Sequence, residues 1–215
     1  MEFYSDRASE RDAVETPQVS DSFSLERRIQ QAEDHRARDT SDKAIPEVHG
    51  FDKSALWSKK EVESDLHENF PPEHLNGSLK DIEYVDETRV NGKGQRVLGV
   101  NSYSPIDGRS EIEIYHPSKG SVAGEQALKE TLSHEIGHSV YWDTDQSVQT
   151  EWGILSRQSA PHEYVSSYAQ TGGEREDFAE SYSAYIRDPA LLEIKSVGKY
   201  EFMRDKIFNG KEYKK

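Results

Sequence analysis

The sequence predicts an α+β domain, residues 46–215, preceded by a polar arm, residues 1–45. Two observations carry this prediction: strand-like alternation with turn signals fills residues 79–117, and helical periodicity follows from residue 121 onward. Strands followed by helices are typical of α+β domains, here with a small antiparallel or mixed sheet packed on helices. A chain of 215 residues is long enough for one core of this kind.

The arm is predicted from composition. Charged side chains make up 32% of the chain and hydrophobic ones 33%, so part of the chain is expected to remain outside the core. Residues 1–45 are rich in Ser, Asp, Glu, Arg and Gln, and at most a short helix is expected around "SLERRIQQAEDHRARD". We expect this arm to be partly disordered and available for docking to a partner or carrier.

Charge and hydropathy exclude two classes of partner. A net charge of −14 argues against nucleic acid, because such binding depends on Lys and Arg that displace counterions. The N-terminus has neither the basic start nor the apolar segment of a secretory signal, and no run of about 18 apolar residues occurs in the chain. Neither a general secretory signal nor a membrane span is therefore expected. The chain is expected to be made in the cytoplasm and, if exported, to use a non-Sec route.

The first element of the domain is expected to be a helix that ends before Pro71. Asp52 or Ser54 can cap it. Its apolar positions recur at helical spacing; they are Leu56, Trp57, Val62 and Leu66.

Three strand segments follow, at residues 79–90, 95–103 and 109–117. The turns between them, "NGKG" and "PIDG", contain the Asn-Gly and Asp-Gly pairs that favour hairpins. We therefore expect an antiparallel meander. The later helical patterns are "AGEQALKETLSHEIGHSVYW", "QSVQTEWGILSRQ", "EREDFAESYSAYIRD" and "KYEFMRDKIF".

The segment "TLSHEIGHSVYW" contains the main candidate site. His134 and His138 stand four apart, so on a helix both imidazoles reach one metal ion. Glu135 lies beside them and is suited to take a proton from a water molecule at that metal. The chain has no cysteine, so any metal must be held by His, Asp or Glu, and Zn²⁺ is the expected ion.

A third protein ligand is expected from a later helix. The pattern HExxHxxGxxH is excluded, because Tyr141 and Thr144 occupy its Gly and last His positions. "GGEREDFAESYSAY" offers three carboxylates, Glu176, Asp177 and Glu180. We expect Glu176 to be the ligand and Glu180 to accept a hydrogen bond from a ligand imidazole, since metal-bound His nearly always has such a partner.

At this point the sequence resembles a known family. "HEIGH", "EDFAESYSAYI" and the upstream "SSYA" are similar to the zinc-dependent catalytic domain of anthrax lethal factor and to related toxin and phage-associated enzymes, which are gluzincin metallopeptidases. "YHPSKG" resembles the exit of that family's edge strand. The resemblance covers residues 95–210 and implies a zincin-like fold, with the HExxH helix and a glutamate helix packed on the sheet.

The resemblance also implies roles for single residues. His134 and His138 correspond to zinc ligands, Glu135 to the general base and Glu176 to the third ligand. Tyr168 in "SSYA" corresponds to the tyrosine that stabilises the oxyanion, with Tyr164 as the alternative.

The chain departs from the family at Asp177, where an aromatic residue is common. The spacing from Tyr168 to Glu176 is also one residue longer than expected, and Gly172-Gly173 can absorb the difference.

These features predict a zinc endopeptidase acting on a protein or peptide, with a toxin or effector role as one setting. The strand that ends at Tyr115 is expected to be an edge that binds an extended peptide. Two other functions stay open: a catalytically silent structural or partner-binding protein of a secreted or phage assembly, and a zinc hydrolase of a non-peptide amide.

The remaining histidines and aromatic residues are interpreted as structural. His162 is expected in a loop and His116 at the surface, and His35, His49, His67 and His74 give no signal for a site. A core stripe is expected from Phe178, Tyr182, Tyr185 and Ile186.

Overall fold

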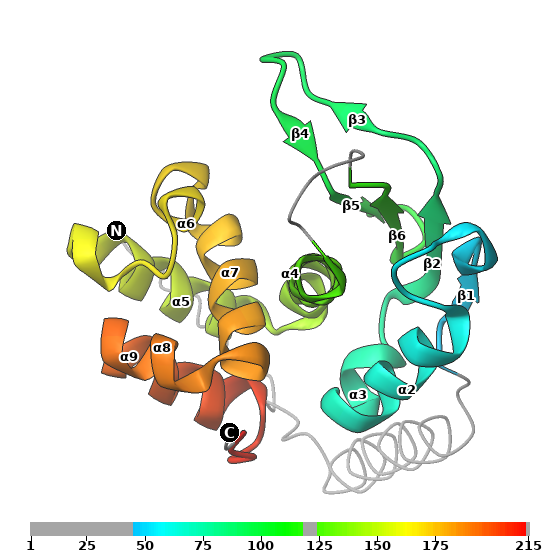
Figure 1. Ribbon diagram of the computed structural model, residues 1–215. Helices are drawn as coiled ribbons and strands as arrows, with labels where there is room; N and C mark the ends of the chain where they lie inside the picture. Colours follow the sequence, from blue (N-terminus) through cyan, green and yellow to red (C-terminus); the bar gives the residue numbers. More distant parts are fainter. Residues whose placement is uncertain (1–44, 118–123, 214–215) are drawn as a thin grey trace, which may run out of the picture. The chain divides into compact units, whose positions relative to one another are not determined.

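The main sheet is mixed, and its strands are not all antiparallel. The computed structural model describes residues 45–117 and 124–213, so the predicted arm before Ile45 lies outside the described residues. Four strands lie in the order β1-β2-β6-β5, with β1 and β6 parallel to β2 and β5 antiparallel to β6 (Figure 1). Their bounds are β1 Glu47–His49, β2 Leu79–Val85, β5 Gly99–Ser104 and β6 Arg109–Tyr115.

The expected antiparallel meander is wrong in one respect. The "PIDG" turn does join an antiparallel pair, β5 and β6, and "NGKG" joins β3 (Arg89–Val90) to β4 (Arg96–Val97). However, β3 and β4 leave the main sheet as a separate two-stranded ribbon (Figure 1). After the ribbon the chain enters β5, which lies on the side of β6 away from β2. β6 therefore lies between β5 and β2 and pairs with β2 in parallel, so the meander is interrupted.

The first helix begins later than expected. α2 (Lys59–Asn69) is capped by Ser58, which forms a reciprocal capping box with Glu61. Asp52 and Ser54 do not cap it, and the first two apolar positions of the expected stripe precede the helix. A second short helix, α3, spans Pro72–Leu75.

The C-terminal part of the described chain is helical, as predicted. α4 packs against β5 and β6 on one side and against α7 on the other (Figure 1). In the described ranges, no helix combines the length and the apolar composition needed to cross a bilayer. The helices are α4 Glu125–Asp143, α5 Gln146–Gln158, α6 Ser167–Gly172, α7 Glu174–Arg187, α8 Pro189–Lys195 and α9 Val197–Phe202, followed by a π-helical turn at Met203–Ile207.

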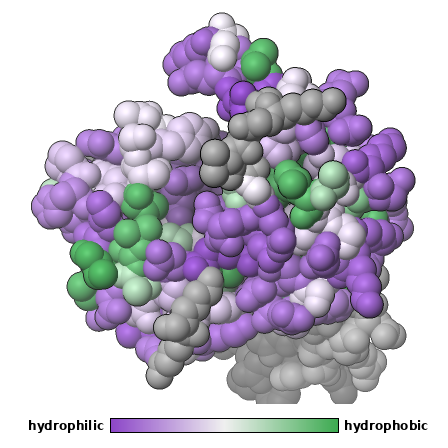
Figure 2. Space-filling model, viewed as in Figure 1, coloured by the Kyte–Doolittle hydropathy of each residue, from purple (hydrophilic) through white to green (hydrophobic). Residues whose placement is uncertain are grey.

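The predicted aromatic stripe of α7 is confirmed as part of the core. Its four side chains, Phe178, Tyr182, Tyr185 and Ile186, are each at most 1% exposed. The viewed surface is mostly hydrophilic, in keeping with the charge content, with a group of hydrophobic side chains at its left and another right of centre (Figure 2). Large hydrophobic residues of α5, α8 and α9 that remain exposed are Ile154, Ile194 and Val197.

His74, which gave no signal in the sequence, is a buried core residue. Its Nε2 lies 3.0 Å from the Ile207 carbonyl oxygen and its Nδ1 lies 2.9 Å from the Tyr182 hydroxyl. A carbonyl can only accept, so Nε2 donates to it and Nδ1 accepts from the tyrosine. Burial lowers the pKa of His74 to about 4, so the ring is neutral in the folded protein at neutral pH.

This burial predicts an acid-dependent loss of stability. The pKa of His74 is lower in the folded than in the unfolded chain, so between about pH 6.5 and 4 the unfolded state binds more protons and the free energy of unfolding falls as the pH falls. We expect the free energy of unfolding of the wild type to fall by roughly 3 kcal/mol over this interval because of His74, and His74→Gln to abolish this part of the decrease. Urea unfolding with EDTA present measures it.

The matched control is His162→Gln, which changes an exposed histidine of the Pro161–Glu163 turn. It should retain the wild-type pH profile. Equal profiles for the wild type and His74→Gln would contradict the role assigned to His74.

Candidate metal centre

The orientation of α4 is set by its apolar residues. Leu128, Leu132 and Ile136 are fully buried and lie one helical turn apart, so they hold one face of α4 against the core. His134 and His138 lie on a different face of the same helix, also one turn apart. Their side chains are only partly exposed, at 12% and 16%, and point toward α7.

A close helix contact brings the second set of side chains to the histidines. A methyl group at Gly137 would lie 3.0 Å from the Cα of Ala179 and 3.2 Å from the Cβ of Tyr182. Glycine at this position of "HEIGH" therefore allows α7 to pack directly on α4. Glu176 and Glu180, which flank Ala179 on α7, reach the imidazoles as a result.

Three potential ligand atoms meet at this contact. His134 Nε2 lies 3.1 Å from His138 Nε2, and Glu176 Oε2 lies 3.2 and 3.3 Å from these two nitrogens. Tetrahedral zinc with ligand bonds of about 2.0–2.1 Å holds its ligand atoms about 3.3 Å apart. The triangle thus matches the spacing that a divalent metal requires.

Hydrogen bonding gives an independent test of the fit. Glu176 Oε2 is buried, and no hydrogen bond of good geometry satisfies it within the described residues. A buried carboxylate oxygen without a hydrogen bond is costly. His134, His138 and Glu176 could therefore hold a metal ion, which would satisfy this oxygen by coordination.

Glu180 fixes the orientation of the first imidazole. Its Oε1 lies 2.8 Å from His134 Nδ1, which leaves Nε2 directed at Glu176 and the candidate metal position. Burial lowers the pKa of His134, but the Glu176 and Glu180 carboxylates outweigh this effect and raise it to about 10. Burial raises the pKa of Glu176, but the imidazoles of His134 and His138 outweigh this effect and hold it far below its usual range.

Glu135 lies beside the triangle without belonging to it. It is 7% exposed, and burial raises the pKa of its carboxyl group. Asn101 of β5 donates to the Glu135 carbonyl at 2.9 Å, which ties the edge strand to α4. A methyl group at Gly99 would come within 2.7 Å of Glu135 Oε1, so this glycine makes room for the carboxylate.

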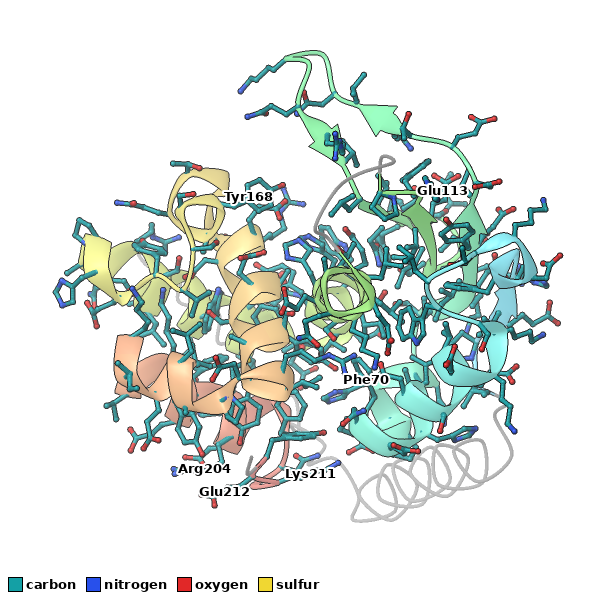
Figure 3. The ribbon with its side chains drawn as sticks, viewed as in Figure 1. Phe70, Glu113, Tyr168, Arg204, Lys211 and Glu212 are labelled. Carbon is teal, nitrogen blue, oxygen red and sulfur yellow. The ribbon has the colours of Figure 1, made fainter. Side chains whose placement is uncertain are left out.

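Tyr168, and not Tyr164, lies at the site. The Tyr168 ring centroid is 6.0 Å from that of His134, and its side chain projects from α6 (Figure 3). Burial and the Glu176 carboxylate raise the pKa of Tyr168 to about 12, so the phenol remains a hydrogen-bond donor at neutral pH. Tyr164 donates instead to the Ser156 carbonyl at 2.8 Å, under the Lys199 side chain.

The cluster lies in a cleft made of two cavities, of about 630 and 680 Å³. The residues that line both cavities are Asn91, Val97, Gly99, His134, Glu135 and Tyr168. Trp142 lines the second cavity, where it stacks on Tyr103 with ring centroids 4.9 Å apart.

The expectation that the strand ending at Tyr115 forms an edge is wrong. That strand, β6, is internal, because β2 pairs on one side and β5 on the other. The edge strand of the cleft is β5, whose Gly99 and Val100 line the second cavity. The segment after Pro117 that resembled the family's edge-strand exit, residues 118–120, lies outside the described residues.

A second group of possible ligands lies on the outer face of the sheet. His49 Nε2 lies 3.2 Å from Glu47 Oε2 and 2.9 Å from Asp81 Oδ1. Glu47 and His49 are exposed, and ordinary ion pairing accounts for the contact. This group therefore serves as a control for the buried cluster.

Two supporting residues, Lys199 and Asn101, were not singled out from the sequence. Lys199 of α9 is fully buried and its Nζ lies 2.8 Å from Asp177 Oδ1, also fully buried. This pair explains the Asp at a position where an aromatic residue was expected, next to Glu176. Asn101, on the inner face of β5, donates hydrogen bonds to the Glu135 carbonyl and to Ser139 Oγ of α4. The signal that could have identified it is a polar residue at an inward-facing position of a strand.

The comparisons with known proteins add no relative. No protein-family model matches the chain, and no curated protein matches it either. The resemblance to gluzincin metallopeptidases rests on the short motifs alone.

We expect the purified protein to bind one divalent metal ion per chain at the buried cluster. Glu176→Ala should lose the ion because it removes a ligand, whereas Glu135→Gln should keep it. Glu180→Ala should weaken binding about 10- to 100-fold. Plasma mass spectrometry after dialysis against zinc measures the content. His49→Ala is the control and should leave it unchanged; metal lost with His49→Ala and kept with Glu176→Ala would contradict the assignment.

The Lys199–Asp177 pair predicts a large stability effect. Lys199→Met should cost about 3–5 kcal/mol, because it leaves the Asp177 carboxylate buried without its counter-charge. The double variant Lys199→Met/Asp177→Leu should recover most of this loss. Urea unfolding with EDTA present tests both, and a single variant as stable as the wild type would refute the coupling.

Proposed function

We propose that the protein is a zinc-dependent endopeptidase with a zincin-like fold. The observation that carries this proposal is the meeting of His134 Nε2, His138 Nε2 and Glu176 Oε2 within 3.3 Å of one another. Glu135 lies next to this triangle, at the point where the two cavities join. A purely structural metal site has no need for such an additional carboxylate.

The residues around the triangle suit peptide hydrolysis. Zinc bound there would act as a Lewis acid toward the scissile carbonyl and the attacking water. Glu135, whose pKa is raised by burial, takes the proton of that water and passes it to the departing amine. Tyr168 keeps its proton and donates a hydrogen bond to the developing oxyanion.

The edge strand supports a peptide as the substrate. β5 pairs only with β6 in the described sheet, so its other edge can hydrogen-bond an extended chain. That edge lies along the cleft beside Glu135, because Gly99 approaches the carboxylate closely. A peptide added to β5 would pass its backbone over the cluster and place side chains in the two cavities.

Digestion of a mixed-sequence synthetic peptide library by the zinc-loaded protein, read by mass spectrometry, tests the proposal. We expect the wild type to cleave, and Glu135→Gln to be inactive although it retains zinc. Tyr168→Phe should lower kcat about 10²- to 10³-fold, since it removes one oxyanion donor. Tyr164→Phe is the matched control and should remain active. A zinc-loaded wild type that cleaves no peptide would refute the function.

A further inference from the structure

The first cavity combines apolar walls with carboxylates that have no ion pair among the described residues. Its role as a substrate pocket rests on the proposed function. The cavity extends from the metal-ligand cluster between α4, α7 and the β3–β4 ribbon, and has a volume of about 630 Å³. Its walls carry the small or aliphatic side chains Ala127, Thr131, Val165, Ala184 and Leu191.

Two acidic side chains of this cavity remain available to a ligand. Glu130 of α4 receives one hydrogen bond, from Gln126 Nε2 at 2.8 Å, and Asp188 receives one, from the Leu191 amide at 3.0 Å. In the described part of the chain neither carboxylate has an ion pair. Each keeps further lone pairs for a donor.

The other charges of the lining are largely committed. Arg187 forms two hydrogen bonds with Asp65, at 2.7 and 2.5 Å, and Glu180 pairs with His134. Arg96, on the β4 side of the ribbon, is the one basic side chain of this lining without an ion pair among the described residues. Within the part of the chain that the structure describes, the two carboxylates without an ion pair, Glu130 and Asp188, therefore outnumber the single basic side chain without one, Arg96.

The second cavity has the opposite character. Its guanidinium, Arg175, stacks on Trp142 with Cζ 5.1 Å from the ring centroid and has no ion pair within the described ranges. Of the carboxylates that line it, Glu174 pairs with Arg157 at 2.5 Å and Glu176 belongs to the triangle, while Glu135 lines both cavities. Apart from the shared Glu135, the two sides of the cleft thus differ in the sign of their uncommitted charge.

We propose that the first cavity selects the side chain of a Lys or Arg residue close to the scissile bond. The apolar walls accept the aliphatic stem of such a side chain, and Glu130 and Asp188 bind its charged end through charge-assisted hydrogen bonds. An uncharged side chain of equal length gains the wall contacts but leaves the carboxylates without a partner. The cavity therefore distinguishes charge as well as size.

The test compares Lys and Arg with norleucine, an uncharged side chain of similar length, in a mixed-sequence synthetic peptide library. Cleavage by the zinc-loaded wild type should favour Lys or Arg over norleucine about tenfold at one position next to the cut. Glu130→Gln/Asp188→Asn should bring this ratio close to one and retain cleavage at norleucine. The control Glu201→Gln, an exposed α9 residue outside the cavity lining, should behave as the wild type.

Binding separates this inference from the proposed function. Zinc-loaded Glu135→Gln, immobilised and incubated with the same library, should retain peptides enriched in Lys and Arg even if no variant cleaves. Adding Glu130→Gln and Asp188→Asn to it should abolish the enrichment. Norleucine retained or cleaved as well as Lys, or retention of no peptide, would overturn the inference; enrichment without cleavage would uphold the pocket and reject only the peptidase.

Discussion

The contact between α4 and α7 at Gly137 is the constraint on which the site depends. The two helices approach so closely there that a single methyl group would meet the Ala179 backbone at 3.0 Å. This distance brings the carboxylates of α7 to the imidazoles of α4. Fully buried residues of both helices, Leu132 and Tyr182 among them, hold the contact in place. Site geometry and core packing are therefore one feature of the fold.

The same contact concentrates charge in a poorly solvated place. Glu135, Glu176 and Glu180 surround two imidazoles, and Asp177 is buried one residue away. Burial opposes ionisation of each carboxylate, so each needs a cation or a donor. Lys199 supplies this for Asp177, and His134 supplies it for Glu180. Glu176 Oε2 has no hydrogen bond of good geometry among the described residues, and it lies beside the two imidazole nitrogens with which it could share a metal ion.

The sequence predicted the local parts of this structure well and the long-range parts less well. Helical spacing within "HEIGH" and within "EDFAE" is local, so the cluster of His134, His138 and Glu176 could be anticipated. The choice of Tyr168 over Tyr164 came from the resemblance, and the structure brings only Tyr168 to the cluster.

Three misses have physical reasons. Strand order was misjudged, because turn signals fix which strands form hairpins but not where a ribbon leaves the sheet. The partner of Asp177, Lys199, lies 22 residues away in the chain, and no periodicity links the two positions. His74 stands 108 residues before Tyr182, so its burial follows from tertiary packing that a short polar stretch does not reveal.

Anomalous diffraction at the zinc absorption edge, from crystals of the wild-type protein grown with zinc, tests the central claim most directly. We expect one strong anomalous peak within bonding distance of His134 Nε2, His138 Nε2 and Glu176 Oε2, with Glu135 beside it but not bound to it. Diffraction from zinc-containing crystals with no peak at this position, or with the only peak between Glu47, His49 and Asp81, would contradict it.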